Sequence, residues 1–159
     1  MRKITILAAA LAFSFAASIL SPAAFAAGGS FDSSPPQFSA SEFEQGRAAI
    51  DKKDWNNAIG HLQKALAKDK NNADIHSYLG YAYRNSGNWD EGIKYYTQAL
   101  AINPNHKGAN EYLGQAYLNR GNVALAEQQL AKLDKICGQS CTEYKMLAVA
   151  VADYKKNPK

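Results

Sequence analysis

One spacing constrains the fold of this chain more than any other feature, because a motif recurs after 34 residues. Tyr-Leu-Gly-Tyr-Ala-Tyr occupies residues 78–83, and Tyr-Leu-Gly-Gln-Ala-Tyr occupies residues 112–117. The pairs that keep this interval are Leu79 and Leu113, Gly80 and Gly114, Tyr83 and Tyr117, and Gly87 and Gly121. Agreement at several positions in one register indicates an internal repeat. A 34-residue period with a Leu-Gly-x-x-Tyr core is typical of an array of helix-turn-helix units.

The pattern resembles the tetratricopeptide repeat (TPR) family. Carried over position by position, the resemblance implies three units, at residues 39–72, 73–106 and 107–140. The second unit fits best, and Pro104 closes it. The third unit ends on Gly138 instead of Pro, and the first begins most irregularly. The resemblance implies an all-α fold, a right-handed α-solenoid of three helix pairs, with a C-terminal capping helix and tail at residues 141–159. It fixes the fold better than the function, because such arrays serve unrelated partners.

The turns inside the three units share one sequence pattern. Asp54, Asn88 and Asn122 each precede a second helix and can accept hydrogen bonds from its free N–H groups. Gly87 and Gly121 stand where the first helix must end in a left-handed residue. The first unit has Lys53 at that place, which predicts a strain of about 1 kcal/mol. Trp55 and Trp89, which open two of the second helices, are expected to pack between helices.

The chain opens with the features of a secretion signal. Arg2 and Lys3 form a basic start, residues 4–20 are apolar, and Ala-Phe-Ala at residues 24–26 is a cleavage pattern. Residues 1–26 are therefore expected to be a signal peptide, with a transmembrane anchor as the alternative. Cleavage would leave no membrane span and would place the protein in the periplasm or outside the cell. Residues 27–38, rich in Gly, Ser and Pro, are expected to form a flexible linker.

Charge and motifs exclude several classes of function. The chain carries 18 basic and 14 acidic residues, mixed along the sequence, so no basic stripe for nucleic acid is expected. His61, His76 and His106 lack the spacing of metal ligands, and His76 is expected to be buried with a hydrogen bond. No phosphate loop, nucleophile elbow or dinucleotide fingerprint is present. The sequence gives no indication of an enzyme, a cofactor or a metal site.

Cys137 and Cys141 lie between the third unit and the last helix. Export to an oxidising compartment favours a disulfide, which across so short a loop would stabilise the fold by at most about 2 kcal/mol. A redox-active pair is the alternative, although redox motifs have two intervening residues and this pair has three. Ser140 and Glu143 fit a capping box for a helix over residues 141–154. Tyr144, Leu147, Val151 and Tyr154 would lie on one face of this helix.

The binding surface follows from the resemblance, which implies that set positions of each first helix face the concave groove. The candidate groove residues are Arg47, Tyr78, Tyr81, Arg84, Asn85, Tyr112, Gln115 and Asn119. Family members that grip a peptide's C-terminal carboxylate use Lys and Asn at certain of these positions, and this chain departs from that pattern. Tyr and Arg still offer large amphipathic contacts and a fork for a carboxylate.

The sequence thus predicts a non-catalytic protein-interaction module in the bacterial cell envelope that binds a peptide or helix in its groove. The partner would be an unidentified envelope protein or peptide, and the chain itself a monomer or weak homodimer. The first alternative is a structural protein that assembles with itself. The second is an accessory protein that uses Cys137 and Cys141 in thiol redox chemistry.

Overall fold

The computed structural model describes residues 41–158, so the predicted signal peptide and linker lie outside the described residues. Within residues 41–158 the chain forms helices and no strand. The helices are α1 (Glu42–Asp51), α2 (Trp55–Lys68), α3 (Ala73–Asn85), α4 (Trp89–Ile102), α5 (Lys107–Asn119), α6 (Val123–Cys137) and α7 (Thr142–Lys156). The predicted all-α fold is confirmed. No helix in this part of the chain has both the length and the hydropathy that a bilayer crossing requires.

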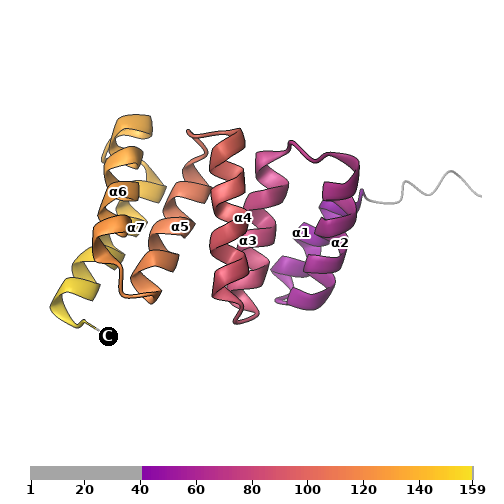
Figure 1. Cartoon of the computed structure of the whole chain (residues 1–159), viewed down its shortest axis with the longest axis horizontal. Coiled ribbons are helices and arrows are strands. Elements are labelled where there is room, and N and C mark those ends of the chain that lie inside the picture. The colour runs from indigo at the N-terminus through magenta and orange to yellow at the C-terminus, as the bar shows by residue number, and fades with distance from the viewer. Residues whose placement is uncertain (1–40, 159) are drawn as a thin grey trace, which may run out of the picture. The chain divides into compact units, whose positions relative to one another are not determined.

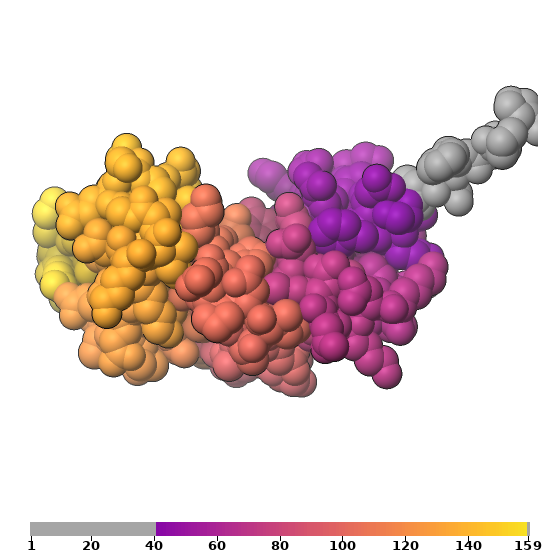
Figure 2. Space-filling view, turned by 90° about the horizontal axis from the view of Figure 1, so that it is seen from above, coloured from indigo at the N-terminus to yellow at the C-terminus, as the bar shows by residue number. Residues whose placement is uncertain are grey.

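The helices pack as hairpins that stack in chain order (Figure 1). The pairs α1 with α2, α3 with α4, and α5 with α6 make the closest contacts, and each pair also packs on the next one. The space-filling view shows the same succession from the first helix pair to the last (Figure 2). Helix α7 packs on α5 and α6. The described residues therefore form an α-solenoid of three helix pairs with a terminal helix.

The predicted turn chemistry is confirmed. The side chains of Asp54, Asn88 and Asn122 accept hydrogen bonds from backbone N–H groups in the first turns of α2, α4 and α6. Gly87 and Gly121 have φ of 92° and 74°. Lys53, at the corresponding place, has a φ of 58°, the left-handed conformation in which the Cβ of an L-residue is crowded.

Glycines in the first helices allow neighbouring helices to approach closely. A Cβ built at Gly80 would lie 2.7 Å from ring carbons of Tyr96, whose side chain is fully buried. Gly46 makes the same close approach to Leu62 of α2. Gly114 departs from this pattern, because the side chain over it is Leu147 of α7. The terminal helix thus uses the close-approach position of the third unit.

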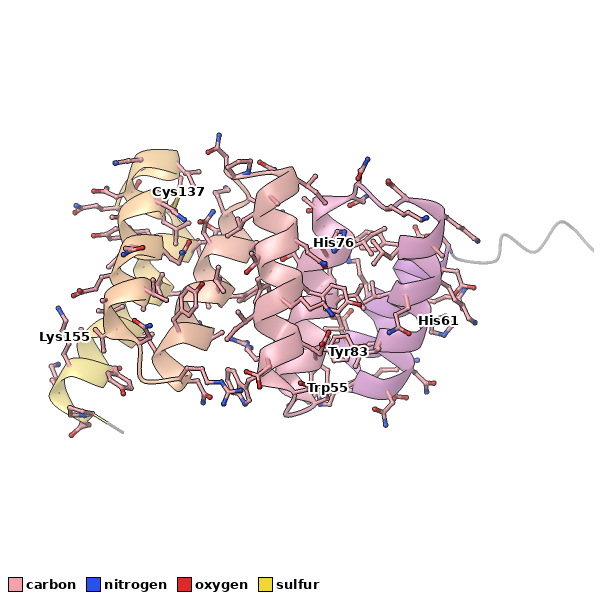
Figure 3. All side chains as sticks on the ribbon, viewed as in Figure 1. Trp55, His61, His76, Tyr83, Cys137 and Lys155 are labelled. Atoms are coloured by element: carbon pink, nitrogen blue, oxygen red, sulfur yellow. A yellow bond between two sulfur atoms is a disulfide. The ribbon has the colours of Figure 1, made fainter. Side chains whose placement is uncertain are left out.

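Aromatic residues pack within the second unit and between it and the first. Trp55 packs edge-on against Tyr81, with 6.2 Å between ring centroids, as expected of a packing residue. Tyr83 stacks on Tyr95 of α4 at 5.3 Å. His76 is 7% exposed, and its Nε2 lies 3.0 Å from the carbonyl oxygen of Lys70, which confirms its expected burial. Trp55, Tyr83 and His76 can be located in Figure 3.

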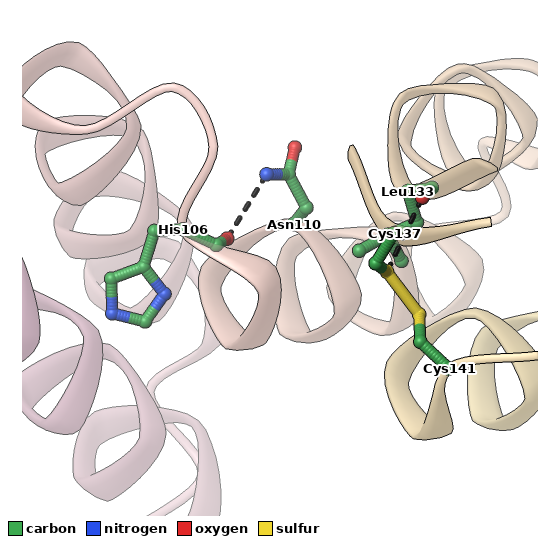
Figure 4. The surroundings of a disulfide bond; sticks show 5 residues. All are labelled: His106, Asn110, Leu133, Cys137 and Cys141. Carbon is green, nitrogen blue, oxygen red and sulfur yellow. Dashed lines mark hydrogen bonds between the residues drawn. A yellow bond between two sulfur atoms is a disulfide. The ribbon is translucent and has the colours of Figure 1, made fainter. Parts of the chain in front are cut away.

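The start of the terminal helix corrects one prediction. Helix α7 begins at Thr142, its N-cap is Cys141, and no side chain caps it, so the capping box of Ser140 and Glu143 is wrong. Gly138, with a φ of 73°, ends α6. Cys141 is joined to Cys137 by a disulfide at this junction (Figure 4). We attribute the shift to this bond, which fixes Cys141 in the N-cap position and leaves Ser140 in the preceding turn.

The predicted apolar face of the terminal helix is confirmed. Leu147 and Val151 are buried in the C-terminal cluster, and Tyr144 and Tyr154 pack against it half-buried. This face covers the end of the array, as expected where a stack of repeats would otherwise leave apolar surface bare.

Candidate functional site

Most of the candidate residues gather on one face of the array, formed by α1, α3, α5 and α7. We call this the groove face and define it by Arg47, Tyr78, Tyr81, Arg84, Tyr112, Gln115, Asn119 and Asp153. Each first helix presents a stripe of positions to it, because residues three and four apart lie on the same side of a helix. The face combines aromatic rings, two arginines and amide side chains.

Arg84 stands at the centre of the groove face. Its guanidinium carbon lies 5.2 Å from the ring centroid of Tyr81, 5.4 Å from that of Tyr112 and 5.9 Å from that of Trp89. Its Nη1 donates a 2.6 Å hydrogen bond to Oε1 of Gln115. Attraction between a cation and aromatic faces holds the group in place. Among residues 41–158 Gln115 is the acceptor for this guanidinium, so further N–H groups can bind a ligand.

Glu111 lies beneath this centre and is 1% exposed. The Gln115 amide joins the two charged groups, since it accepts from Arg84 and donates to Glu111. Burial raises the pKa of the Glu111 carboxyl to about 7, although Arg84 and the Gln115 hydrogen bond favour the charged form. The Glu111 carboxyl is therefore partly neutral near pH 7.

The first cavity of the groove face has a volume of about 310 Å³. We call it the tyrosine cavity; its lining residues are Ile50, Asp74, Ser77, Tyr78, Tyr81, His106, Gly108 and Tyr112. Three tyrosine rings from α3 and α5 form most of its aromatic surface. His106 and Asp74, 2.9 Å apart, lie at one side. Nδ1 of His106 also accepts a 3.0 Å hydrogen bond from the Ala109 N–H and so caps α5.

The second cavity, of about 500 Å³, lies between the ends of α5 and α7. We call it the α7 cavity; its lining residues are Trp89, Gln115, Leu118, Asn119, Ala150, Asp153, Tyr154 and Asn157. Apolar surface comes from Trp89, Leu118 and Ala150, and amide and carboxylate groups stand among these residues. The space can accept an apolar side chain and offers hydrogen bonds to a peptide backbone.

The structure brings seven of the eight candidate residues into this arrangement. Tyr78, Tyr81 and Tyr112 line the tyrosine cavity, Gln115 and Asn119 line the α7 cavity, and Arg84 lies between the two. The exposed Arg47 sits over Tyr78, with its guanidinium carbon 5.6 Å from the ring centroid. Asn85 differs, because its side-chain amide donates back to the carbonyl oxygen of Tyr81 in its own helix.

The contribution of α7 escaped the sequence analysis. The 34-residue interval continues into this helix, since Leu147 follows Leu113 and Asp153 follows Asn119 at that distance. Helix α7 therefore resembles the first helix of a fourth unit, and its groove positions could have been predicted by extending the interval. Met146 and Val149, also in register with groove positions, are 49% and 60% exposed. The α7 wall of the groove face thus includes exposed apolar surface.

The cysteines lie apart from the groove face, at the junction of α6 and α7. Sγ of Cys137 lies 3.4 Å from the carbonyl oxygen of Leu133, a contact that Figure 4 marks. The two sulfur atoms and the Glu143 carboxylate are close enough to suit a metal ion in their geometry. Both sulfurs are bonded to each other, however, and only free thiolates ligate metals well. This form of the protein therefore holds a disulfide at that position.

Solved structures share the fold at low sequence identity. The TPR domain of Arabidopsis OM64 has a TM-score of 0.66 and 18% identity over 71% of this chain and 93% of that domain. The second TPR domain of human RPAP3, solved with the HSP70 peptide SGPTIEEVD, has a TM-score of 0.65 and 20% identity over 74% and 94%. The Yersinia enterocolitica chaperone SycD, in complex with a peptide of the translocator YopD, has a TM-score of 0.63 and 16% identity over 72% and 87%. A search among curated proteins finds no significant match.

Family models match the sequence directly. Two models described as tetratricopeptide repeat match residues 73–106 and 95–128, and one described as TPR repeat matches residues 46–87. Together they cover residues 46–128, more than half of the chain. With the helical pairs and the repeat positions of the structure, these matches establish that the chain belongs to the tetratricopeptide repeat family.

Proposed function

We propose that this protein is a non-catalytic interaction module of the bacterial cell envelope, which binds a peptide or helix of a partner protein on its groove face. The envelope location rests on the predicted signal peptide. The binding mode rests on the groove face, where two cavities and Arg84 between them can accept successive side chains of a bound peptide. Rigid aromatic residues supply contact area there at a low cost in conformational entropy.

One observation carries this proposal: Arg84 is held by three aromatic rings and Gln115, yet retains N–H groups for a ligand. A surface arginine without a binding role would normally extend into water, since ordering a long side chain has an entropic cost. Here the fold has already ordered the group. Binding a partner would then cost less entropy, which is the advantage of a preorganised site.

The structural neighbours agree with a peptide partner. The human RPAP3 domain was solved with an HSP70 peptide and SycD with a YopD peptide, so this fold holds peptides in proteins with the same arrangement of helices. Because their identity to this chain is low, these neighbours support the fold and do not identify the partner. The departure from the Lys and Asn carboxylate pattern argues for a ligand other than a chaperone tail.

The test is capture of partners from an envelope extract on the immobilised mature protein. We expect Arg84→Ala to lose proteins that the wild type retains, and Tyr81→Ala combined with Arg84→Ala to lose them more completely. Lys94→Ala is the matched control, because Lys94 pairs with Glu91 on the surface of α4 and lines neither cavity. Recovery of the same proteins by the wild type and by Arg84→Ala would contradict the proposal.

A further inference from the structure

The outward side of α7 is an unpartnered helix face with an apolar centre. Leu147 and Val151 are buried against the array, and Val149, midway between them in the sequence, lies on the opposite side of the helix and is 60% exposed. Met146 is 49% exposed, and Ala152, three residues beyond Val149, is exposed as well. Single exposed apolar side chains are normal, whereas neighbouring ones mark a surface for interaction. Helix α7 lies at the end of the array opposite to α1, as Figure 2 shows.

The repeat interval indicates which side of α7 a further unit would cover. Glu111 and Leu118 of α5 are buried, and α7 packs on α5. Lys145 and Ala152 follow them after 34 residues, and both are exposed on α7. In a stack of repeats this side of a helix packs against the next unit. Within residues 41–158 no helix follows α7, so its outward side has no neighbour there.

The charges on this face identify a second copy of the chain as its occupant. Lys145 and Asp153, both exposed, lie four residues before and four residues after Val149. Neither side chain forms an ion pair within the part of the chain that the structure describes. In an antiparallel pair of α7 helices with a two-fold axis at Val149, Lys145 of each copy meets Asp153 of the other. Met146 likewise meets Ala152, so a large side chain lies opposite a small one.

The antiparallel direction suits these side chains better than the parallel one. A parallel pair of α7 helices would bring Lys145 close to Lys145 and Asp153 close to Asp153, and like charges repel each other. The antiparallel pair matches opposite charges, and it brings the same patch of both copies together, as a two-fold interface requires. Two charge pairs then flank an apolar centre.

We infer that α7 is a self-association surface, through which two copies of the chain pair antiparallel about a two-fold axis at Val149. Helix α7 has 15 residues, which makes it about 22 Å long. A contact confined to one such helix per copy stays below the roughly 1,200 Å² of a stable interface, so the dimer should be weak and depend on concentration. The inference goes beyond the proposed function, because Arg84 and Tyr81 take no part in the contact. Asp153 also lines the α7 cavity, so the dimer and a ligand in that cavity share this side chain.

Charge reversal tests the pairing. Sedimentation equilibrium of the mature protein over a wide range of concentrations should show a dimer of the wild type. Lys145→Asp and Asp153→Lys each turn two attractive pairs into repulsive ones, so each should weaken dimerisation about tenfold. An equimolar mixture of the two variants should regain it, because every pair in the mixed dimer again joins opposite charges. Two weakened variants that do not recover on mixing would overturn the inference.

Two further variants serve as controls for this experiment. Lys68→Asp makes the same charge change at an exposed position of α2 and should dimerise as the wild type does. Val149→Lys places two like charges at the two-fold axis and should remain monomeric. A dimer that persists in Val149→Lys would show that the contact lies elsewhere, for instance on the first unit, and would overturn the inference.

A cross-link locates the axis. The chain has two cysteines, and they are bonded to each other, so a cysteine introduced on α7 provides the only free thiol. Val149→Cys should form a disulfide-linked dimer on mild oxidation, because its two copies face each other at the axis. Lys156→Cys is the matched control, since this exposed position lies seven residues, or about 10 Å, from the axis. Equal cross-linking of the two variants would contradict the assigned register.

The outcomes separate this inference from the proposed function. Arg84→Ala should lose partners from the envelope extract and still dimerise as the wild type does. If the wild type stays monomeric at every concentration, the self-association surface is wrong, and the proposed function stands. If the wild type dimerises as described while partner capture is independent of Arg84, the proposed function is wrong and this inference stands.

Discussion

At the scale of single residues, Glu111 is the unusual group among residues 41–158, because a carboxyl is rarely buried without a direct cationic partner. It is linked to Arg84 only through the Gln115 amide. In the folded chain its pKa is about 7 against a usual 4.5, so the folded state holds the proton more tightly than the unfolded state. The stability gained from the neutral carboxyl is fully present below about pH 4.5 and is lost as the pH rises through 7.

We therefore predict that Glu111→Gln changes the pH dependence of stability. The variant should exceed the wild type in its free energy of unfolding at pH 8 by up to about 3 kcal/mol, the equivalent of the pKa shift. The difference should shrink towards pH 5, where the wild-type carboxyl is neutral. Urea unfolding at both pH values measures this. Glu91→Gln is the control, because Glu91 lies at the surface beside Lys94. A difference between variant and wild type that is the same at both pH values would contradict the prediction.

Two glycines allow a second test at this scale. A Cβ at Gly80 would meet the Tyr96 ring, whereas a Cβ at Gly60 meets nothing within 4 Å. Gly80→Ala should thus lower the free energy of unfolding by about 1–3 kcal/mol through overpacking. Gly60→Ala should raise it by up to about 1 kcal/mol, because Ala has the higher helix propensity. Thermal and urea unfolding compare the two. A stabilised Gly80→Ala would show that the close approach is absent in solution.

At the scale of elements, much of the fold could be predicted because the decisive interactions are local. The caps at Asp54, Asn88 and Asn122 depend on residues within three positions, and the left-handed turns on a single backbone angle. The burial of Glu111 could not be predicted from its neighbours in the sequence. A polar residue at a groove position suggests exposure, but packing against residues distant in sequence buries it. The α7 cavity was likewise missed, because its walls come from α4, α5 and α7, and the whole of α6 separates the last two in the sequence.

The turn between α1 and α2 provides the prediction at this scale. Lys53 has a φ of 58° at the place where the other two units have glycine. Lys53→Gly should relieve the strain and raise the free energy of unfolding by about 1 kcal/mol. Lys52→Gly is the control, because Lys52 has a right-handed φ of −84° and glycine only adds freedom to the unfolded chain there. Thermal unfolding should rank Lys53→Gly above the wild type and Lys52→Gly below it. The reverse order would contradict a strained turn.

At the scale of the whole molecule, a change that destabilises one unit should mainly destabilise the units next to it. The reason is that each helix pair contacts only the adjacent pairs, and α7 contacts only α5 and α6. In such an array the loss of one interface destabilises the unit beside it first. Leu147 is fully buried and lies against Gly114, so its side chain joins α7 to the third unit. The first and second units carry Trp55 and Trp89, and the third carries no Trp. Fluorescence and circular dichroism can therefore report on different parts of the array.

We predict that Leu147→Asp separates these two signals. In a Trp89→Phe background, Trp55 fluorescence reports on the first unit and circular dichroism on all helices. Without the substitution at Leu147 the two urea transitions should coincide, as expected of a small cooperative domain. Leu147→Asp buries a charge in the last interface, so the helical signal should begin to fall at lower urea than the fluorescence changes. Val149→Asp places the same charge on an exposed position of α7 and should leave the transitions coincident. Coincident transitions in Leu147→Asp would contradict the prediction and mean that the three units unfold together. Binding at the α7 end would then stabilise the first unit as strongly as the third.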